Sequence, residues 1–497
     1  MKINSSEQNI ANVLARFESA LEPELVTAGA KAAASEIKAV LLDLYRRQGP
    51  QKDLLQKLIE SGNELKKDIE QFLRSEAPQT NGLGHAATNL NCFDDLAQHY
   101  DKLSTQLFLL LEELRTTPQE SAEVAKLMRR GAEWEVAYFE GIQKIPVEMP
   151  SHVDLLDPPA PELSHEYLQR FFDGKIPGLQ VKKFERLSGG HGKQTYLCTI
   201  LRPDGTTEDR IIRKEDPCPV IVHPQFGLER EYALLKALNK IDFPAPKVYE
   251  FGKQIPGPDG VDGAFATMQL LPGAIPSNFL ASGGSKFSED LLLHMAEVLA
   301  KLHSVPLEIF SDYFEAWEDP NIAKQTTRDR YQNCLEQWIE YSQEFEHLPS
   351  AYLVWILDWL LKHIPEDSRA PVLVHGDYNV HNVLAENNRM TGLLDWETAD
   401  FGAPEQDLAY IQPLVSKSME WSKFLQHYHA CGGKEVDESR FPFYLAYGVL
   451  RVVLAFNRAT LNLQKRWSPD IRFNMVELGY QAVFMRMGLS YTETAPS

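Results

Sequence analysis

Cysteine and basic residues are scarce in this sequence. The five cysteines are odd in number, widely spaced and without a CxxC pair: Cys92, Cys198, Cys218, Cys334 and Cys431. This spacing excludes a disulfide framework and a cysteine-based zinc site, and it predicts reduced thiols. Lysine and arginine number 50 against 70 aspartate and glutamate residues, a formal charge of −20. Because so acidic a chain repels phosphate backbones and shows no basic patch, we expect no nucleic-acid partner.

Long apolar runs and breaker-rich segments are scarce as well. The N-terminus, MKINSSEQNIANVLARFESALEPE, has no apolar core of signal-peptide length. The longest apolar stretch, Tyr444–Phe456, is interrupted by Arg451, and we expect it to be too short to span a bilayer. Proline and glycine, at 30 and 29 residues, are too few for a collagen-like or low-complexity chain. These absences predict a cytoplasmic protein with no membrane insertion.

The pattern of apolar and polar residues changes at a proline-rich stretch. Residues 1–145 have apolar positions at helical spacing, such as Leu54, Leu58 and Leu65, and no strand-like alternation. Five prolines between positions 146 and 161 then predict an extended linker over residues 146–164. Since residues 1–145 show no cluster of reactive side chains, we expect an all-helical module for packing, self-association or binding of a protein partner.

Residues 165–271 have the pattern of a small β-rich lobe. The segments VKKFERL, TYLCTIL and EDRIIRKE predict three strands, with the glycine loop SGGHGK between the first two. A helix from about Gly227 and two more strands follow, which is the order found in the small lobe of a kinase. Residues 272–497 are mostly helical, except near 371–397. The sequence therefore predicts an α+β, bilobal, kinase-like fold preceded by an all-α domain.

The segment PVLVHGDYNVHNVL contains the side chains best suited to catalysis. Asn382 lies five residues after Asp377, and Asp395 ends the next apolar run thirteen residues later. Phosphoryl transfer from ATP needs a carboxylate to orient a hydroxyl group and accept its proton. It also needs oxygen ligands for Mg²⁺, which carboxylate and amide groups supply. We therefore predict Asp377 as the general base and Asn382 and Asp395 as Mg²⁺ ligands.

These motifs resemble those of the aminoglycoside phosphotransferase and choline kinase group of kinase-like enzymes. HGDxxxxN is that group's signature, LLDWE is similar to its metal-binding motif, and the resemblance extends from about Glu162 to the C-terminus. It implies ATP and Mg²⁺ as cofactors and a small molecule with a hydroxyl group as acceptor. It also implies nucleotide-binding positions in the glycine loop, on a strand, on a helix and at the hinge: Gly189, Gly190, Gly192, Lys193, Arg213, Glu231, Gln269 and Leu270.

The sequence departs from that group at three places. Gly192 and Lys193 replace the usual Ser and Asn of the loop, although Lys193 could itself reach a phosphate. The strand cation for the α/β phosphates, which Glu231 would orient, is Arg213 and not the Lys of that group. Lys214 is the fallback for this role. Ala403 replaces the Asp of a GDP motif, so we expect Asp400 or Asp407 to supply the structural hydrogen bonds of that residue.

Other interpretations of the same residues remain open at this point. Asp377 and Asn382 alone would also suit helix caps and loop contacts. A metallohydrolase site is an alternative for His375, Asp377, His381 and Asp395, and Glu397 is interpreted as a loop carboxylate. The leading prediction is an ATP- and Mg²⁺-dependent phosphotransferase acting on a small-molecule hydroxyl. The alternative is a catalytically weak, kinase-like nucleotide-binding protein that acts through its helical module.

Overall fold

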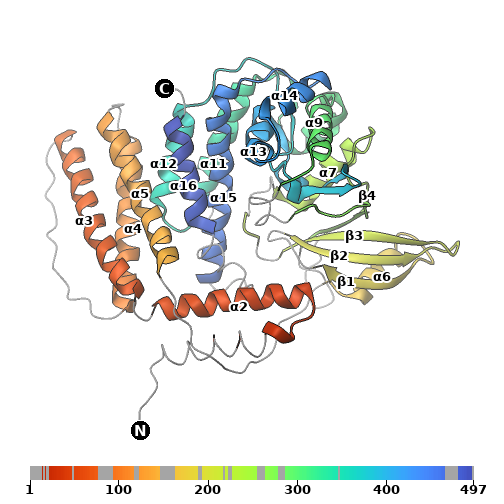
Figure 1. Cartoon of the computed structure of the whole chain (residues 1–497), viewed down its shortest axis with the longest axis horizontal. Helices are drawn as coiled ribbons and strands as arrows, with labels where there is room; N and C mark the ends of the chain where they lie inside the picture. The colour runs from red at the N-terminus through yellow and green to blue at the C-terminus, as the bar shows by residue number, and fades with distance from the viewer. Residues whose placement is uncertain are drawn as a thin grey trace, which may run out of the picture. The chain divides into compact units, whose positions relative to one another are not determined.

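The computed structural model describes two compact units of the chain (Figure 1). The helical unit combines Met1–Pro159, Glu346–Lys362 and Val449–Glu493, and the mixed unit combines Ala160–Phe345, His363–Gly448 and Thr494–Ser497. Within them, the described residues are 14, 17, 22–47, 50–76, 93–116, 122–145, 163–187, 193–216, 219–221, 226–253, 263–277, 286–344, 347–464 and 480–494.

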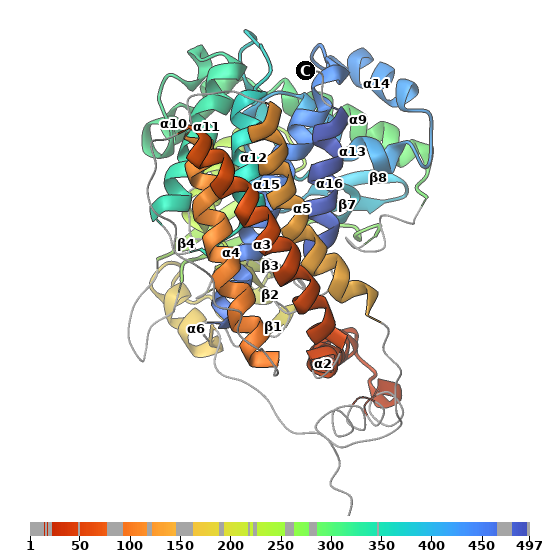
Figure 2. The ribbon, with the colours of Figure 1, turned by 90° about the vertical axis from the view of Figure 1, so that its left-hand side faces the viewer.

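Long amphipathic helices form the N-terminal part of the helical unit. A short 3-10 turn, η2 (Glu22–Glu24), precedes α2 (Ala28–Arg47), α3 (Pro50–Glu76), α4 (Phe93–Arg115) and α5 (Ala122–Lys144). Helices α3, α4 and α5 pack side by side (Figure 2). Gly62 on α3 permits this close approach, because a Cβ there would lie 2.8 Å from both Leu103 and Trp134. The helical nature expected for residues 1–145 is confirmed for the described part of that segment.

The helical unit is completed by segments from much later in the chain. Helix α12 (Ala351–Lys362) packs against α4 and α5, and α16 (Gln481–Thr494) is joined to α5 by an Arg486–Glu140 ion pair of 2.7 Å. The buried carboxylate of Glu135 on α5 accepts hydrogen bonds from Ser350 Oγ and from Tyr352 N at the start of α12. The units therefore differ from the expected boundaries at 145 and 272. Residues 146–162 of the expected linker lie outside the described residues.

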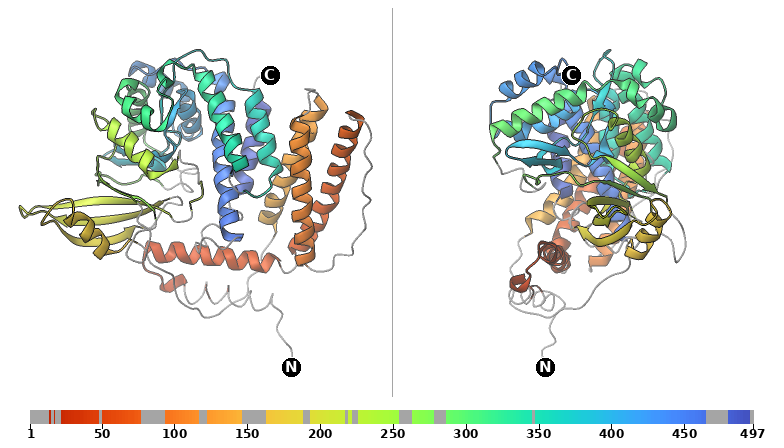
Figure 3. Two further views of the ribbon diagram at one scale, coloured as in Figure 1. Left: turned by 180° about the vertical axis from the view of Figure 1, so that it is seen from behind. Right: turned by 90° about the vertical axis from the view of Figure 1, so that its right-hand side faces the viewer.

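A five-stranded antiparallel sheet forms one layer of the mixed unit. Its strands are β1 (Gln180–Leu187), β2 (Lys193–Leu201), β3 (Thr207–Glu215), β4 (Val248–Gly252) and β5 (Phe265–Gln269), in the order β1-β2-β3-β5-β4. Alternate residues point to opposite faces of a strand. Tyr196, Cys198 and Ile212 thus form one core with residues of α6 (His165–Asp173). The ribbon views of Figure 3 show this helix beside the sheet. On the other face, Ala266 and Met268 pack with residues of α7 (Leu228–Leu238).

The remainder of the mixed unit is largely helical. Its helices are α9 (Glu289–His303), α10 (Ser311–Trp317), α11 (Thr327–Glu344), α13 (Glu405–Val415), α14 (Trp421–Ala430) and the start of α15 (Phe441–Gln464). Short 3-10 turns η4 (Leu307–Phe310), η5 (Ile322–Lys324) and η8 (Glu438–Arg440) connect some of them. The exception around residues 371–397, expected from the sequence, consists of short strands.

Two strand pairs and two 3-10 turns build this exceptional segment. Strand β6 (Val372–Val374) pairs with β9 (Asp400–Gly402), and β7 (Val383–Glu386) pairs with β8 (Arg389–Leu393). The turn η6 (Val380–Asn382) precedes β7, and η7 (Trp396–Thr398) follows β8. The mixed unit therefore has the β-rich lobe and the mostly helical lobe of the predicted α+β, kinase-like fold.

One described stretch has the length and composition of a membrane span. The stretch Glu438–Asn462, with a mean hydropathy of 1.2, is long and apolar enough to cross a bilayer. The expectation that the apolar stretch here would be too short was therefore wrong on length. Core helices pass the same test, and half of the most apolar window is buried within the structure, so the finding is weak support for a span.

Candidate active site

One buried carboxylate holds the loop that follows β6. Asp407, in the first turn of α13, accepts hydrogen bonds from the backbone N–H groups of His375 at 2.8 Å and Gly376 at 2.7 Å. His303 Nε2 of α9 lies 3.2 Å from the same carboxylate. Burial raises the pKa of Asp407, but the hydrogen bond and charge of His303 outweigh it, so the pKa is lowered overall. With Gly376 at a φ of 78°, the loop turns sharply and presents Asp377.

Asp377 and Asn382 are direct neighbours in this loop. The Asn382 Nδ2 group donates to Asp377 Oδ2 at 2.7 Å and to the Asp377 carbonyl oxygen at 3.0 Å. His381 Nε2 lies 3.4 Å from the same Oδ2 atom, and 29% of the Asp377 side chain remains exposed. The N-cap of η6 is Asn379, whose side chain accepts from Val380 N. The structure thus assigns this helix cap to Asn379, and Asp377 keeps an accessible carboxylate.

The two predicted Mg²⁺ ligands flank the β7–β8 hairpin. Asn382 directly precedes β7, and Asp395 follows β8 with a left-handed φ of 64°. Leu394 N donates to the Asn382 carbonyl oxygen at 2.8 Å, and His375 Nε2 lies 2.9 Å from the Leu394 carbonyl oxygen. Pairing of β7 with β8 therefore places Leu394, the residue before Asp395, next to Asn382. His375 has a structural role here, because it contacts the carbonyl group of Leu394.

Asp395 meets a cation from the five-stranded sheet. The Arg213 NH2 group of β3 donates to Asp395 Oδ1 at 2.8 Å, and Arg213 NH1 lies 3.3 Å from Glu231 Oε1 of α7. Arg213 pairs with Asp395 although the two residues lie 182 positions apart in sequence, so this carboxylate has a protein cation beside it as well as the predicted role of a metal ligand. Burial raises and Arg213 lowers the pKa of Asp395, and the net effect is a lowering.

Strand alternation separates the two candidate phosphate-binding cations. Arg213 points toward Glu231 and Asp395, whereas the neighbouring Lys214 directs its Nζ to the carbonyl oxygen of Glu215 at 3.0 Å. Successive residues of a strand face opposite sides of the sheet. Arg213 rather than Lys214 therefore lies beside Glu231. The family resemblance led us to expect this position for the phosphate-binding cation of the strand.

Lys193 and Glu397 complete a cluster of charges around Arg213. Lys193, at the start of β2, forms ion pairs with Glu397 of η7 and, at 3.5 Å, with Glu231. Its Nζ also donates to the Phe226 carbonyl oxygen at 3.2 Å, and the side chain is only 5% exposed. Lys193 is thus a buried residue, and Glu397, interpreted as a loop carboxylate, belongs to this cluster. The signal for Glu397 in the sequence was its place two residues after Asp395.

The charges of this cluster perturb one another strongly. Burial would lower the pKa of Lys193, but Glu397 and Glu231 raise it above its ordinary value. Burial also raises the pKa of Glu397, and the nearby Asp395 charge adds to the rise. Two cations face three carboxylates, so the cluster has one negative charge in excess when all are ionised. Clusters of perturbed groups are typical of functional sites.

The remaining candidate positions lie apart from these contacts or outside the described residues. Gln269 N, at the end of β5, donates to the Lys247 carbonyl oxygen at 2.8 Å, and the next residue, Leu270, is 42% exposed. Gly189, Gly190 and Gly192 lie outside the described residues. Among the residues that are described, no group of three or more His, Cys, Asp and Glu side chains forms a metal site, so the metallohydrolase alternative lacks geometric support.

Comparison with known families shows the family of the chain. A model of the phosphotransferase enzyme family (APH) matches residues 183–435, about half of the chain. The chain belongs to this family. The match includes the described site residues from Lys193 to Asp407, and the predicted family and kinase-like fold are confirmed. Membership of the phosphotransferase family also supports a kinase-like function for the chain.

Two curated relatives of this phosphotransferase-family chain are longer proteins. The chain is 24% identical over 340 residues to probable acyl-CoA dehydrogenase IBR3 of Arabidopsis thaliana, a match to 62% of the chain and 40% of the relative. It is 27% identical over 206 residues to acyl-CoA dehydrogenase family member 11 of Homo sapiens, covering 40% of the chain and 24% of the relative. The chain thus spans less than half the length of these relatives.

One solved structure is similar to the chain at low identity. It is that of a macrolide 2'-phosphotransferase type I, 19% identical, with a TM-score of 0.41 over 67% of this chain and 97% of the other.

Proposed function

We propose that this phosphotransferase-family chain transfers the γ-phosphoryl group of ATP to a hydroxyl group of a small molecule. The observation that supports this most directly is that two residue pairs lie close together. The backbone of Leu394, the residue before Asp395, is hydrogen-bonded to Asn382 and so connects them. On one side stands the Asp377–Asn382 pair, and on the other the Asp395–Arg213 pair. Phosphoryl transfer requires a base, oxygen ligands and a phosphate-binding cation within one small region, and this arrangement supplies all three.

Asp377 has the contacts expected of a general base. The side chains of Asn382 and His381 both contact the Oδ2 atom of the Asp377 carboxylate. Oδ1 of Asp377 is therefore the oxygen available to an acceptor hydroxyl. In the proposed reaction, Asp377 accepts the hydroxyl proton as the acceptor oxygen bonds to the γ-phosphorus. The bond from that phosphorus to the bridging oxygen of ADP breaks, and the products are ADP and a phosphate monoester. The loop is held for this task by Asp407.

Asn382 and Asp395 fit a small hard cation. Asn382 uses Nδ2 for both hydrogen bonds to Asp377, which leaves its amide oxygen as the group that can bind a metal ion. The Asp395 side chain is 38% exposed, and its lowered pKa keeps it ionised at neutral pH. Mg²⁺ binds through one or two protein oxygens together with water and phosphate oxygens. When bound, Mg²⁺ would neutralise charge on the phosphates.

Arg213 and Glu231 have the arrangement of a phosphate-binding cation and the residue that orients it. Arg213 is nearly buried and is aimed by the Glu231 carboxylate, of which only 2% is exposed. A guanidinium group binds phosphate oxygens through two parallel hydrogen bonds. Lys193 lies on the other side of Glu231 and is proposed as a second phosphate contact from the start of β2, together with the glycine loop that precedes it.

The proposal is tested by comparing Asp377→Asn with the natural protein on a panel of hydroxyl metabolites. ATP consumption and phosphate-ester formation are the measurements, with aminoglycosides, choline, sugars and hydroxyacyl thioesters in the panel. The last class is included because the curated relatives are named acyl-CoA dehydrogenases. We expect Asp377→Asn to bind Mg-ATP normally and to lower kcat by about 10²–10⁴. Unchanged turnover of an identified acceptor would exclude Asp377 as the base.

A kinase-like binding protein without turnover is the competing outcome of that experiment. Mg²⁺-dependent nucleotide binding without phosphate-ester formation from any member of the panel would favour it over the proposed enzyme. Cytoplasmic location and a partner for the helical unit remain predictions from the sequence.

A further inference from the structure

A buried charge network joins α7 to the helical lobe of the mixed unit. Arg230, which precedes Glu231 on α7, forms an ion pair with Glu318 at the end of α10, and it lies 3.9 Å from Asp400 of β9. Arg330 of α11 lies 3.1 Å from Glu318 and 2.5 Å from Asp400. We call these four residues the Arg230 network. It thus connects α7 to one strand and two helices of the other lobe.

All four members are withdrawn from solvent. The exposed fractions of their side chains are 5% for Arg230, 7% for Glu318, 3% for Arg330 and 14% for Asp400. The guanidinium group of Arg230 also lies 5.5 Å from the centre of the Tyr313 ring. Two buried cations and two buried carboxylates balance one another only when each stays beside its partners. A displacement of α7 would therefore leave a buried charge without its partner. This energetic cost restricts the position of α7.

The position of α7 matters for the nucleotide site because Glu231 is the next residue. Neighbouring residues of an α-helix point about 100° apart, so one turn of α7 directs Arg230 to this network and Glu231 to Arg213 and Lys193. Helix α7 also packs on α10 and on η7, the turn that contains Glu397. The Arg230 network and the charge cluster around Arg213 thus share a single helix.

We propose that Arg230 is a positioning residue for the nucleotide site. Its network fixes α7 against the helical lobe, so that Glu231 keeps Arg213 aimed at the phosphates before nucleotide arrives. Of the two carboxylates expected to supply structural hydrogen bonds, Asp400 belongs to the Arg230 network, and Asp407 binds the loop that follows β6. This inference rests on the proposed function, in that the site it organises is the proposed ATP site.

Two variants of the full-length chain test the role of Arg230. Arg230→Met removes the charge at similar length, and Arg230→Lys keeps the charge but not the planar fork that reaches both carboxylates. The lysine variant preserves a measurement if the methionine variant fails to fold. Mg-ATP affinity is measured by calorimetry, and hydrogen exchange of the α7 amides is measured without nucleotide.

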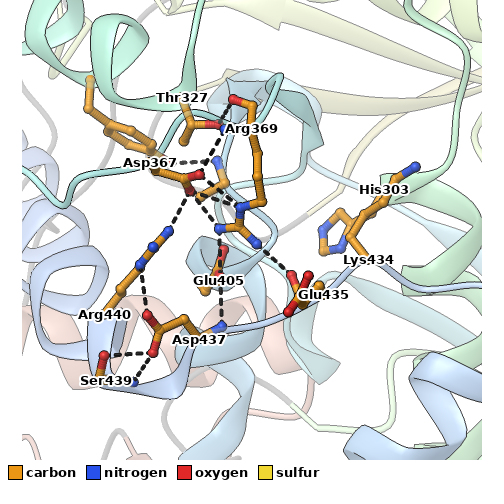
Figure 4. A network of polar contacts seen from close by, with 12 residues as sticks. His303, Thr327, Asp367, Arg369, Glu405, Lys434, Glu435, Asp437, Ser439 and Arg440 are labelled. Carbon is orange, nitrogen blue, oxygen red and sulfur yellow. Dashed lines mark hydrogen bonds and ion pairs between the residues drawn. The ribbon is translucent and has the colours of Figure 1, made fainter.

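A matched control is Arg369→Met, in the network shown in Figure 4. Arg369 pairs with the buried carboxylates of Asp367 at 2.5 Å and Glu405 at 2.8 Å, and it touches no residue of α7 in any described contact. This variant removes a comparable pair of ion contacts from the same unit. It should lower the melting temperature while leaving Mg-ATP affinity and α7 exchange unchanged.

For Arg230→Met we expect faster exchange along α7 and Mg-ATP affinity reduced between about tenfold and a hundredfold. Arg230→Lys should show a smaller change in the same direction. If both variants bind Mg-ATP as the natural protein does and exchange at α7 like the Arg369→Met control, Arg230 does not position the site. If the natural protein fails to bind Mg-ATP, the proposed function fails, and α7 exchange alone still decides whether Arg230 holds the helix.

Discussion

Replacing Arg213 by alanine separates the proposed nucleotide site most sharply from a purely structural charge cluster. Arg213 lies 2.8 Å from Asp395, 3.3 Å from Glu231 and 3.6 Å from Glu397. Without it, Lys193 is the one cation left in the cluster, and the excess of negative charge rises from one to two. Breaking a buried pair such as Arg213–Glu231 costs about 3–5 kcal/mol of stability. The Asp395 contact adds little, because that carboxylate is 38% exposed.

The loss of nucleotide affinity follows from the contacts that the guanidinium would make. A hydrogen bond to a charged group contributes about 1.5–3 kcal/mol, and about 1.4 kcal/mol corresponds to a tenfold change in affinity. We therefore expect Arg213→Ala to weaken Mg-ATP binding by at least about tenfold, and the added negative charge to repel the phosphates further.

The assay is calorimetric titration of Mg-ATP at fixed ionic strength into the natural protein, Arg213→Ala and Lys236→Ala. Lys236 is an exposed residue of α7 and serves as the control for removal of one positive charge. Its replacement should leave the affinity unchanged. Equal affinities in the natural protein and Arg213→Ala would refute the assignment of Arg213 to the phosphates.

Three further predictions concern the metal, the helical unit and its packing. Asp395→Ala should erase the Mg²⁺ dependence of nucleotide-induced thermal stabilisation, and a variant that keeps the full Mg²⁺-dependent shift would contradict its role as a ligand. Burial raises the pKa of Glu135 to about 7 from 4.5, so the folded chain binds an extra proton between these values. Its contribution to stability therefore falls as the pH rises from 4.5 to 7, by about 3 kcal/mol. Glu135→Gln should flatten that part of the melting-temperature profile, and an unchanged slope would show that Glu135 does not titrate there. Gly62→Val should cost about 1–3 kcal/mol in a denaturant melt, because a Cβ at Gly62 would lie 2.8 Å from Trp134. Gly448→Val is the control for an added side chain at a helical position, because no atom lies within 4 Å of a Cβ there.

Local patterns in the sequence predicted the fold of the mixed unit. Strand alternation, the glycine loop and the spacing of Asp377, Asn382 and Asp395 all belong to short stretches of chain, and the predicted family and fold are confirmed. The contact between Asn382 and Asp377 could also be expected, since a five-residue loop keeps both groups close. The roles of these residues remain predictions.

Contacts between distant segments could not be predicted in the same way. Arg213 and Asp395 belong to separate secondary-structure elements, and only the folded sheet brings Arg213 to the end of β8. The burial of Lys193 could not be predicted, because its partners, Glu231 and Glu397, are far away in sequence. The sequence did not reveal which segments make up the helical unit, for the same reason. The apolar faces of α12 and α16 do not specify which helices pack against them.

The dispersed origin of the helical unit has a consequence for synthesis of the protein on the ribosome. Helix α5 ends at Lys144, but α12, which covers it and supplies the hydrogen-bond partners of Glu135, begins at Ala351. At about 5–20 residues per second, roughly 10–40 s separate the two helices during translation. Throughout that interval the side of α5 that packs on α12, and with it the Glu135 carboxylate, lacks its native partner, whereas α3 and α4 are already present. Helices α3, α4 and α5 are therefore made before the mixed unit, but they complete their packing only after α12 and α16 have been synthesised.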